Sequence, residues 1–150
     1  DNIEVLVHRQ SILHSAVVHS DGPVNGLLGT PEMRLPIQYA LTYPERSNYA
    51  FEKLSLADIG TLTFQKPDTE TFRCLPLCIK AINEGGLRPT AVNGANEEAV
   101  RLFLEGRIKF LQIAELVEKA AYSLQNKKEF ELEDIIETDR LSRKAVNSYI

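Results

Sequence analysis

The sequence predicts an α+β fold, in which a small antiparallel or mixed sheet is followed by a four-helix-type bundle. Two patterns carry this prediction. In the first third of the chain, apolar and polar residues alternate, which is typical of strands. Further on, apolar residues recur at i, i+3, i+4 and i+7, which is typical of amphipathic helices. With 150 residues, 43% of them hydrophobic, the chain can form one moderate domain or two small subdomains.

Three strand-like runs precede the first helix. Residues 3–7 alternate with period 2, residues 12–19 are rich in β-branched and apolar side chains, and residues 24–28 form a third run. Asp21-Gly22 is a turn signal between the last two runs, which are therefore predicted to form a hairpin.

A short helix and a long irregular segment are expected next. The helix is predicted over residues 37–42, because a proline precedes it and suits a first helical turn. Residues 45–68 lack clear periodicity, and we interpret them as a linker that holds one more short strand at 62–64. The sequence therefore predicts a first subdomain over residues 1–44 and a second over residues 69–150.

Four helical segments with short connections make up the second subdomain. They cover residues 69–84, 89–105, 110–124 and 131–149. Asp68 or Thr69 is the expected N-cap of the first, whose regular part begins at about Leu75 because Pro76 suits only a first turn. The third has the strongest amphipathic pattern. The fourth is partly periodic, with an expected apolar face of Leu132, Ile135, Ile136, Leu141, Ala145 and Val146.

Charge and hydropathy exclude several classes of partner. The net charge is −4 and no basic patch is visible, so no nucleic-acid partner is expected. No apolar run is long enough for a membrane span, and the first residues lack the features of a secretory signal. The chain begins without Met on a strand-like run, which is expected of a fragment of a longer protein and equally of a processed one.

The histidines invite two catalytic interpretations. His8, His14 and His19 would be a three-histidine metal site, and Ser11 with His14 a nucleophile and base. No carboxylate is spaced to complete the metal site, apart from Glu4 on the first run and Asp21 in the turn. Ser11 and His14 have no orienting acid nearby and no nucleophile elbow. We favour histidines that form hydrogen bonds near a polar sheet edge.

Two further motifs have competing interpretations. Cys74 and Cys78 share a helix face, where a disulfide has poor geometry, so we favour two small buried thiols. Asn93 is interpreted as a helix cap and Asn96 as a buried polar residue; the alternative is an asparagine pair that holds a ligand or an interdomain contact. The chain also lacks a glycine-rich phosphate loop after a strand. The residues themselves therefore indicate no catalytic centre and no metal site.

Several segments together resemble one family. They are residues 3–15 with His8-Arg9-Gln10-Ser11 and His14-Ser15, the turn Asp21-Gly22-Pro23-Val24, the run Leu28-Gly29-Thr30-Pro31-Glu32-Met33-Arg34-Leu35-Pro36-Ile37, the motif Asn93-Gly94-Ala95-Asn96-Glu97, and residues 104–110. Their order and spread resemble 1-deoxy-D-xylulose 5-phosphate reductoisomerase over essentially the whole chain. That family makes 2-C-methyl-D-erythritol 4-phosphate for non-mevalonate isoprenoid biosynthesis, using NADPH and Mg²⁺ or Mn²⁺.

The resemblance implies that the two parts of the chain belong to different domains of the enzyme. Residues 1–44 would end the central catalytic and dimerisation domain, and residues 69–150 would be the C-terminal helical bundle. The cofactor fingerprint and the metal and substrate ligands would all precede residue 1, so the chain alone would carry no cofactor. His8, Pro31 and Met33 would line the substrate and nicotinamide pocket, His8 through hydrogen bonds and Met33 as an apolar contact; the alternative for Met33 is ordinary core packing.

Three departures from the family pattern stand in this chain. Arg9 replaces the usual proline, Glu32 a common aspartate and Gly94 a common alanine, and the last two changes are expected to be mild. None of the three removes a catalytic group.

Two hypotheses follow. In the first, the chain is the C-terminal portion of a cytoplasmic bacterial reductoisomerase and is inactive without the remainder of that enzyme. In the second, it is a stand-alone, non-catalytic interaction or dimerisation module. A truncation of this kind predicts self-association through the sheet formed by residues 3–28, because the removal of neighbouring strands leaves an open edge and exposed apolar surface.

Overall fold

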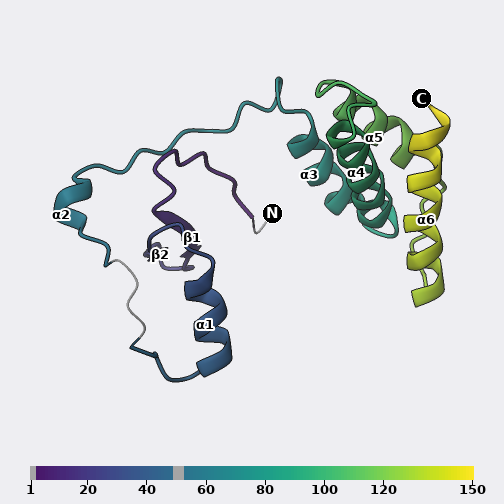
Figure 1. Cartoon of the computed structure of the whole chain (residues 1–150). Coiled ribbons are helices and arrows are strands. Elements are labelled where there is room, and N and C mark those ends of the chain that lie inside the picture. Colours follow the sequence, from purple (N-terminus) through teal and green to yellow (C-terminus); the bar gives the residue numbers. More distant parts are fainter. Residues whose placement is uncertain (1–2, 49–52) are drawn as a thin grey trace. The chain divides into compact units, whose positions relative to one another are not determined.

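The computed structural model describes residues 3–48 and 53–150, within which the chain forms two strands and six helices (Figure 1). The chain divides into two units, Asp1–Pro67 and Asp68–Ile150. Both strands and the two short helices belong to the first unit, and the four helices α3 to α6 belong to the second. Residues 49–52 of the expected linker lie outside the described residues.

The first unit contains the predicted hairpin. Strand β1 (Leu13–Val18) pairs antiparallel with β2 (Val24–Leu28), and Val18 lies opposite Val24 next to the turn. The turn contains Asp21 and Gly22, and the φ angle of Gly22 is 103°, a conformation that favours glycine. The α+β prediction is confirmed, with a sheet of two antiparallel strands.

The predicted strand over residues 3–7 is wrong. Only Val7 pairs, in an isolated bridge with Gln65, where each backbone N–H donates to the other residue's carbonyl at 2.8 and 3.0 Å. The expected strand at 62–64 is absent as well. A strand needs a ladder of successive partners, and the described residues provide a single pair here.

Two short helices complete the first unit. Helix α1 (Arg34–Thr42) begins three residues before its predicted start, so that Pro36 falls within the first turn, where a missing N–H is tolerated. Helix α2 (Leu56–Ile59) was not predicted. The hydroxyl of Ser55 accepts a hydrogen bond from Asp58 N at 3.3 Å, which is the N-cap pattern.

The second unit is the predicted four-helix bundle. Its helices are α3 (Cys74–Glu84), α4 (Arg88–Leu104), α5 (Gln112–Ser123) and α6 (Leu132–Ser148). Asp68 does not cap α3 directly. Its carboxylate accepts hydrogen bonds from Glu70 N (3.1 Å) and Thr71 N (3.0 Å), and so stabilises the turn that leads into the helix.

Helix α4 supplies the centre of the hydrophobic core. Ala95, Ala99 and Leu102 of α4 are fully buried against α5 and α6. The amphipathic pattern predicted for α5 is confirmed by the burial of its apolar positions, which are Ile113, Leu116, Val117, Ala120 and Ala121. The core thus consists mainly of alanine and aliphatic side chains, which allows the helices to approach closely.

The expected apolar face of α6 is wrong in part. Val146 is buried as expected, and Ile135, Leu141 and Ala145 are half-buried, but Leu132 and Ile136 are 64% and 60% exposed. The fully buried positions are Thr138, Ser142 and Val146, of which the first two were not expected. These three residues are spaced i, i+4, i+8 and therefore form one stripe. The stripe faces inward because small side chains fit the narrow space between α6 and α4.

Gly94 marks the closest approach of these two helices. A Cβ atom at this position would lie 2.3 Å from Ser142 Oγ and 3.1 Å from the backbone oxygen of Asp139. The replacement of the common alanine by Gly94 is therefore not the mild change that was expected, because atoms of α6 occupy the space that an alanine methyl group would need.

The first unit has no buried residue among those that the structure describes. Val17, Val18 and Val24 of the hairpin are 61%, 67% and 60% exposed. All the buried side chains of the described chain belong to the second unit. The hairpin therefore displays an apolar surface that its own unit does not cover. Within residues 3–48 and 53–150, no helix is both long and apolar enough to cross a membrane.

Candidate functional site

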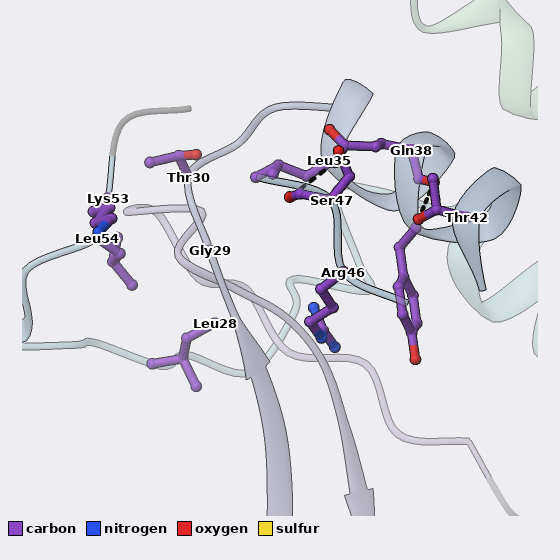
Figure 2. Close-up of a pocket in the computed structure, with 11 residues that line it drawn as sticks. Leu28, Gly29, Thr30, Leu35, Gln38, Thr42, Arg46, Ser47, Lys53 and Leu54 are labelled. Carbon is purple, nitrogen blue, oxygen red and sulfur yellow. Dashed lines mark hydrogen bonds between the residues drawn. The ribbon is translucent and has the colours of Figure 1, made fainter. Parts of the chain in front are cut away.

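A hollow in the first unit lies between the end of β2, helix α1 and the segment that follows it (Figure 2). Its volume is about 320 Å³, and it opens to solvent. Its wall combines aliphatic side chains with polar ones: Leu28, Gly29, Thr30, Leu35, Gln38, Tyr39, Thr42, Arg46, Ser47, Lys53 and Leu54.

Hydrogen bonds and ring contacts fix one side of this hollow. Gln38 Nε2 donates to Ser47 O at 3.3 Å, and Thr42 Oγ1 lies 3.1 Å from Gln38 O, as Figure 2 shows. The Arg46 guanidinium lies over the Tyr39 ring, with its Cζ 4.3 Å from the ring centroid. These contacts hold the chain after α1 against the helix, while Lys53 brings a second cation to the wall.

The loop between β2 and α1 is fixed by its own polar groups. His14 Nε2 lies 3.3 Å from Thr30 O. The Glu32 carboxylate accepts hydrogen bonds from the backbone N and the guanidinium of Arg34, the former at 3.0 Å. The hydrogen bond from the Arg34 side chain lowers the pKa of Glu32 to about 2. Glu32 is therefore a carboxylate at neutral pH, and it turns the loop into the first turn of α1.

Two of the predicted pocket residues lie on this loop, outside the hollow's wall. Pro31 and Met33 are exposed, Met33 by 71%. Neither residue lines the hollow. Core packing of Met33 is therefore wrong for the described residues, and its thioether side chain is available to another surface.

His8, the third predicted pocket residue, belongs to a separate cluster. Its Nδ1 lies 2.8 Å from Thr63 O, and its ring stacks on Phe64 with the centroids 4.8 Å apart. Gln10 Oε1 accepts a hydrogen bond from Thr63 Oγ1 at 2.9 Å. Because Nδ1 must donate to a carbonyl, Nε2 of a neutral ring is an acceptor. That atom is buried and has no hydrogen-bond partner among the described residues.

Neither the three-histidine metal site nor the Ser11–His14 pair is formed among the described residues. No group of three or more His, Cys, Asp or Glu side chains is placed there to hold a metal ion. His14 contacts Thr30 O, and the hydrogen bonds of the described residues include none between Ser11 and His14. Ser11 is exposed with a φ of 53°, in the turn after His8.

The asparagine motif lies inside helix α4, which corrects the cap prediction. Helix α4 begins at Arg88, so Asn93 is an exposed mid-helix residue and Asn96 is half-buried. Asn93 lines a shallow hollow of about 550 Å³ beside Ile135, Ile136 and Asp139 of α6. Asn96 is not the fully buried polar residue that was expected.

The cysteines are both free, but only one is partly buried. Cys74 is half-buried and Cys78 is exposed, so the prediction of two buried thiols is wrong for Cys78. Burial raises the pKa of the Cys74 thiol. Its lower reactivity follows, because the thiolate is the reactive form.

Two charged residues of the bundle were missed by sequence reasoning. Glu98 is buried and accepts hydrogen bonds from Arg101 Nη2 and Asn147 Nδ2, both at 2.6 Å. The hydrogen bond from Arg101 lowers the pKa of Glu98 to about 2, although burial opposes it. Arg88 is buried as well, over the Tyr122 ring, and its guanidinium donates to the carbonyl oxygens of Ala121 and Leu124. The i, i+3 spacing of Glu98 and Arg101 is a weak sequence signal for the ion pair between these two residues.

The family follows from comparison with known proteins. A profile described as the DXP reductoisomerase C-terminal domain, where DXP is 1-deoxy-D-xylulose 5-phosphate, matches residues 28–145. The chain belongs to the DXP reductoisomerase family. The reductoisomerase of Acetivibrio thermocellus is 49% identical over 150 residues, which cover all of this chain and 39% of that protein. That of Paraburkholderia phymatum is 45% identical over the whole chain and 37% of its own length.

Solved reductoisomerase structures share the fold. The enzyme of Zymomonas mobilis, described in complex with NADPH, has a TM-score of 0.88 at 38% identity and covers 97% of this chain. A reductoisomerase described in complex with NADPH, fosmidomycin and magnesium has a TM-score of 0.85 at 36% identity over 95% of the chain. The chain spans 39% and 37% of these two structures, so it matches well under half of a reductoisomerase.

Proposed function

We propose that the chain is the C-terminal portion of an NADPH- and divalent-metal-dependent reductoisomerase that converts 1-deoxy-D-xylulose 5-phosphate to 2-C-methyl-D-erythritol 4-phosphate. The observation that carries the proposal is a match over the entire chain at 49% identity to a protein of which it spans 39%. Two related reductoisomerase structures are described in complex with NADPH, and one of them also with magnesium. Those ligands belong to the relatives, and the proposal extends them to the parent of this chain.

On this proposal the chain is inactive by itself. The described residues do not fit a divalent-metal site, because they hold no group of carboxylates and histidines at ligand spacing. The first unit buries none of its described side chains, whereas a catalytic site must exclude water. NADPH, the metal ion and their ligands would come from the larger part of the enzyme.

The two parts of the chain would then have different tasks. Residues 1–44 would complete the central domain and residues 69–150 would form the C-terminal bundle, with residues 45–68 as the linker. The hairpin's uncovered valines support the first assignment, because an apolar sheet face requires a partner. We place the parent enzyme in the bacterial cytoplasm, in keeping with its bacterial relatives.

His8, Pro31 and Met33 would form one wall of the substrate and nicotinamide pocket. The Glu32–Arg34 hydrogen bonds hold the Met33 loop in a defined conformation, with the Met33 side chain exposed to a flat apolar ligand. The buried Nε2 of His8 would accept a hydrogen bond from a donor in the rest of the enzyme. Neither group performs a chemical step in this proposal.

The open hairpin would also make the isolated chain self-associate. Among the described residues each of its strands pairs only with the other, which leaves one edge of each strand open, and the exposed valines add apolar surface. In the whole enzyme the same sheet would be extended by neighbouring strands or by a second copy.

A chimeric enzyme tests the proposal. All 150 residues are fused to the upstream portion of the Acetivibrio thermocellus reductoisomerase, in place of the segment that they match. NADPH oxidation with 1-deoxy-D-xylulose 5-phosphate and Mg²⁺ should be measurable for the chimera and absent for the isolated chain. The upstream portion alone is the matched control. A folded but inactive chimera would count against the proposal.

A further inference from the structure

Helix α3 is apolar on two opposite faces. Its inward face places Leu77 and Ala81 in the core, at 7% and 1% exposure. Its outward face places Leu75, Ile79 and Ile82 in one stripe, since residues spaced i, i+4, i+7 share a face. Ile79 and Ile82 are 46% and 64% exposed, and Leu75 is half-buried. A helix that needed only to close the bundle would carry polar residues there.

The stripe is extended at its N-terminal end. Phe72, one turn before Leu75, is 58% exposed, and its carbonyl accepts a hydrogen bond from Leu75 N at 3.2 Å. Cys78, which is exposed, lies next to Ile79 along the stripe's edge. We call Phe72, Leu75, Ile79 and Ile82 the outer α3 stripe.

Charged groups beside the stripe are already engaged within the bundle. Arg73 Nη2 donates to Glu118 Oε2 at 2.7 Å. The Lys80 ammonium lies over the Tyr122 ring, 4.3 Å from its centroid. The stripe therefore presents apolar surface without cations directed at a partner, which suits the apolar face of a protein and not an anionic membrane or nucleic acid.

The area of the stripe indicates which protein it fits. The exposed fractions correspond to roughly 300 Å² of surface, for side chains of this size. A contact would bury about twice that, near the lower end of interfaces between domains of one chain. It falls well below the approximately 1,200 Å² of a stable complex between separate chains. A second copy bound through this stripe alone would not hold.

We propose that the outer α3 stripe docks on an apolar face in the upstream portion of the reductoisomerase chain. The relatives supply that portion, because the matched segment is 37–39% of their length. The inference rests on the proposed function and adds to it the surface that couples the helical bundle to the catalytic part. Of the exposed apolar helix faces in the bundle, the stripe is the longest; the pair Leu132 and Ile136 on α6 spans one turn.

Cys78 provides a built-in reporter for docking. Its alkylation by iodoacetamide is followed by mass spectrometry in the isolated chain and in the chimera with the Acetivibrio thermocellus upstream portion. Docking should slow the reaction about tenfold in the chimera, because a thiol beside a covered stripe becomes inaccessible. In the chimera, the double variant Ile79→Ser/Ile82→Ser should raise the alkylation rate of Cys78 to the rate measured for the same variant in the isolated chain. Ile136→Ser, at a similarly exposed position on α6, is the matched control and should leave the protection intact.

The outcomes separate the two proposals. An active chimera in which Cys78 reacts as fast as in the isolated chain would overturn docking and leave the proposed function standing. A folded chimera without activity would overturn the proposed function. Protection of Cys78 in the isolated chain by higher protein concentration, or by phosphatidylglycerol vesicles, would replace the proposed partner by a second copy or a membrane and would overturn the inference. Circular dichroism checks the fold of each variant, and Ile82→Lys alone serves if the double variant fails to fold.

Discussion

Replacing Gly94 by alanine should have two effects of opposite sign on the free energy of unfolding. In an exposed helix, Gly→Ala stabilises by about 1 kcal/mol, because alanine has the higher helix propensity. At residue 94 the new methyl group would lie 2.3 Å from Ser142 Oγ and 3.1 Å from the Asp139 backbone oxygen. Ser142 is fully buried and its hydroxyl donates to Asp139 O at 2.8 Å, so it has little freedom to move away.

The steric clash should outweigh the gain in helix propensity. Overpacking of this kind costs roughly 1–3 kcal/mol, which leaves Gly94→Ala destabilising by about 1 kcal/mol after the gain in propensity. For a unit of this size, that lowers the melting temperature by about 5 °C. Adding Ser142→Ala removes the nearest atom and should recover about 1 kcal/mol, as a coupling energy in a double-mutant cycle.

Urea unfolding followed by the helical circular dichroism signal measures these differences in the whole chain. The neighbouring exposed substitution Asn93→Ala is the control, and it should raise stability by a few tenths of a kcal/mol. If Gly94→Ala also raised stability, the close α4–α6 contact inferred here would be wrong.

Three further predictions concern charge and association. Because the folded-state pKa of Glu98 is lowered to about 2 from its ordinary 4.5, its contribution is complete above pH 4.5 and is lost as the pH falls through about 2. Glu98→Gln should therefore cost roughly 2–3 kcal/mol in urea unfolding at about pH 7 and much less at about pH 2, and equal costs would argue against the Arg101 interaction as the cause. Arg88→Met should cost about 2–3 kcal/mol, since it leaves the Ala121 and Leu124 carbonyl groups without a donor and uncovers the Tyr122 ring. A free energy of unfolding that changed by only a few tenths of a kcal/mol, measured by thermal unfolding, would contradict this. The isolated chain should sediment with a concentration-dependent mass that Val17→Lys reduces, whereas a monomer at every concentration would exclude association through the hairpin.

The bundle helices could be predicted because the residues that determine a helix lie within a few positions of one another in the sequence. The third helical segment repeats apolar residues every three or four positions, and α5 buries those same positions. The run over residues 3–7 also had the right local pattern, yet formed only the Val7–Gln65 bridge, because a strand depends on partners elsewhere in the chain. The buried side of α6 was predicted only in part: Val146 was expected, but Thr138 and Ser142 were missed because they are polar, and only the small contact surface of α4 explains their burial.

The candidate site shows the same limit. Sequence resemblance drew attention to His8 and Met33, but their surroundings depend on contacts far apart in the chain, such as His8 with Thr63. The hollow beside α1 brings Lys53 to the same wall as Thr30, a juxtaposition without a sequence signal. Arg88 lies two residues after Gly86, outside any periodic apolar pattern, so its burial was visible only in the fold.

We propose that the chain supplies a necessary but non-catalytic portion of a reductoisomerase. NADPH oxidation, measured with 1-deoxy-D-xylulose 5-phosphate and Mg²⁺, compares the isolated chain, the upstream portion of the Acetivibrio thermocellus relative, and the chimera of the two. Turnover is expected from the chimera alone. Turnover by the isolated 150 residues, or by the upstream portion without them, would contradict it.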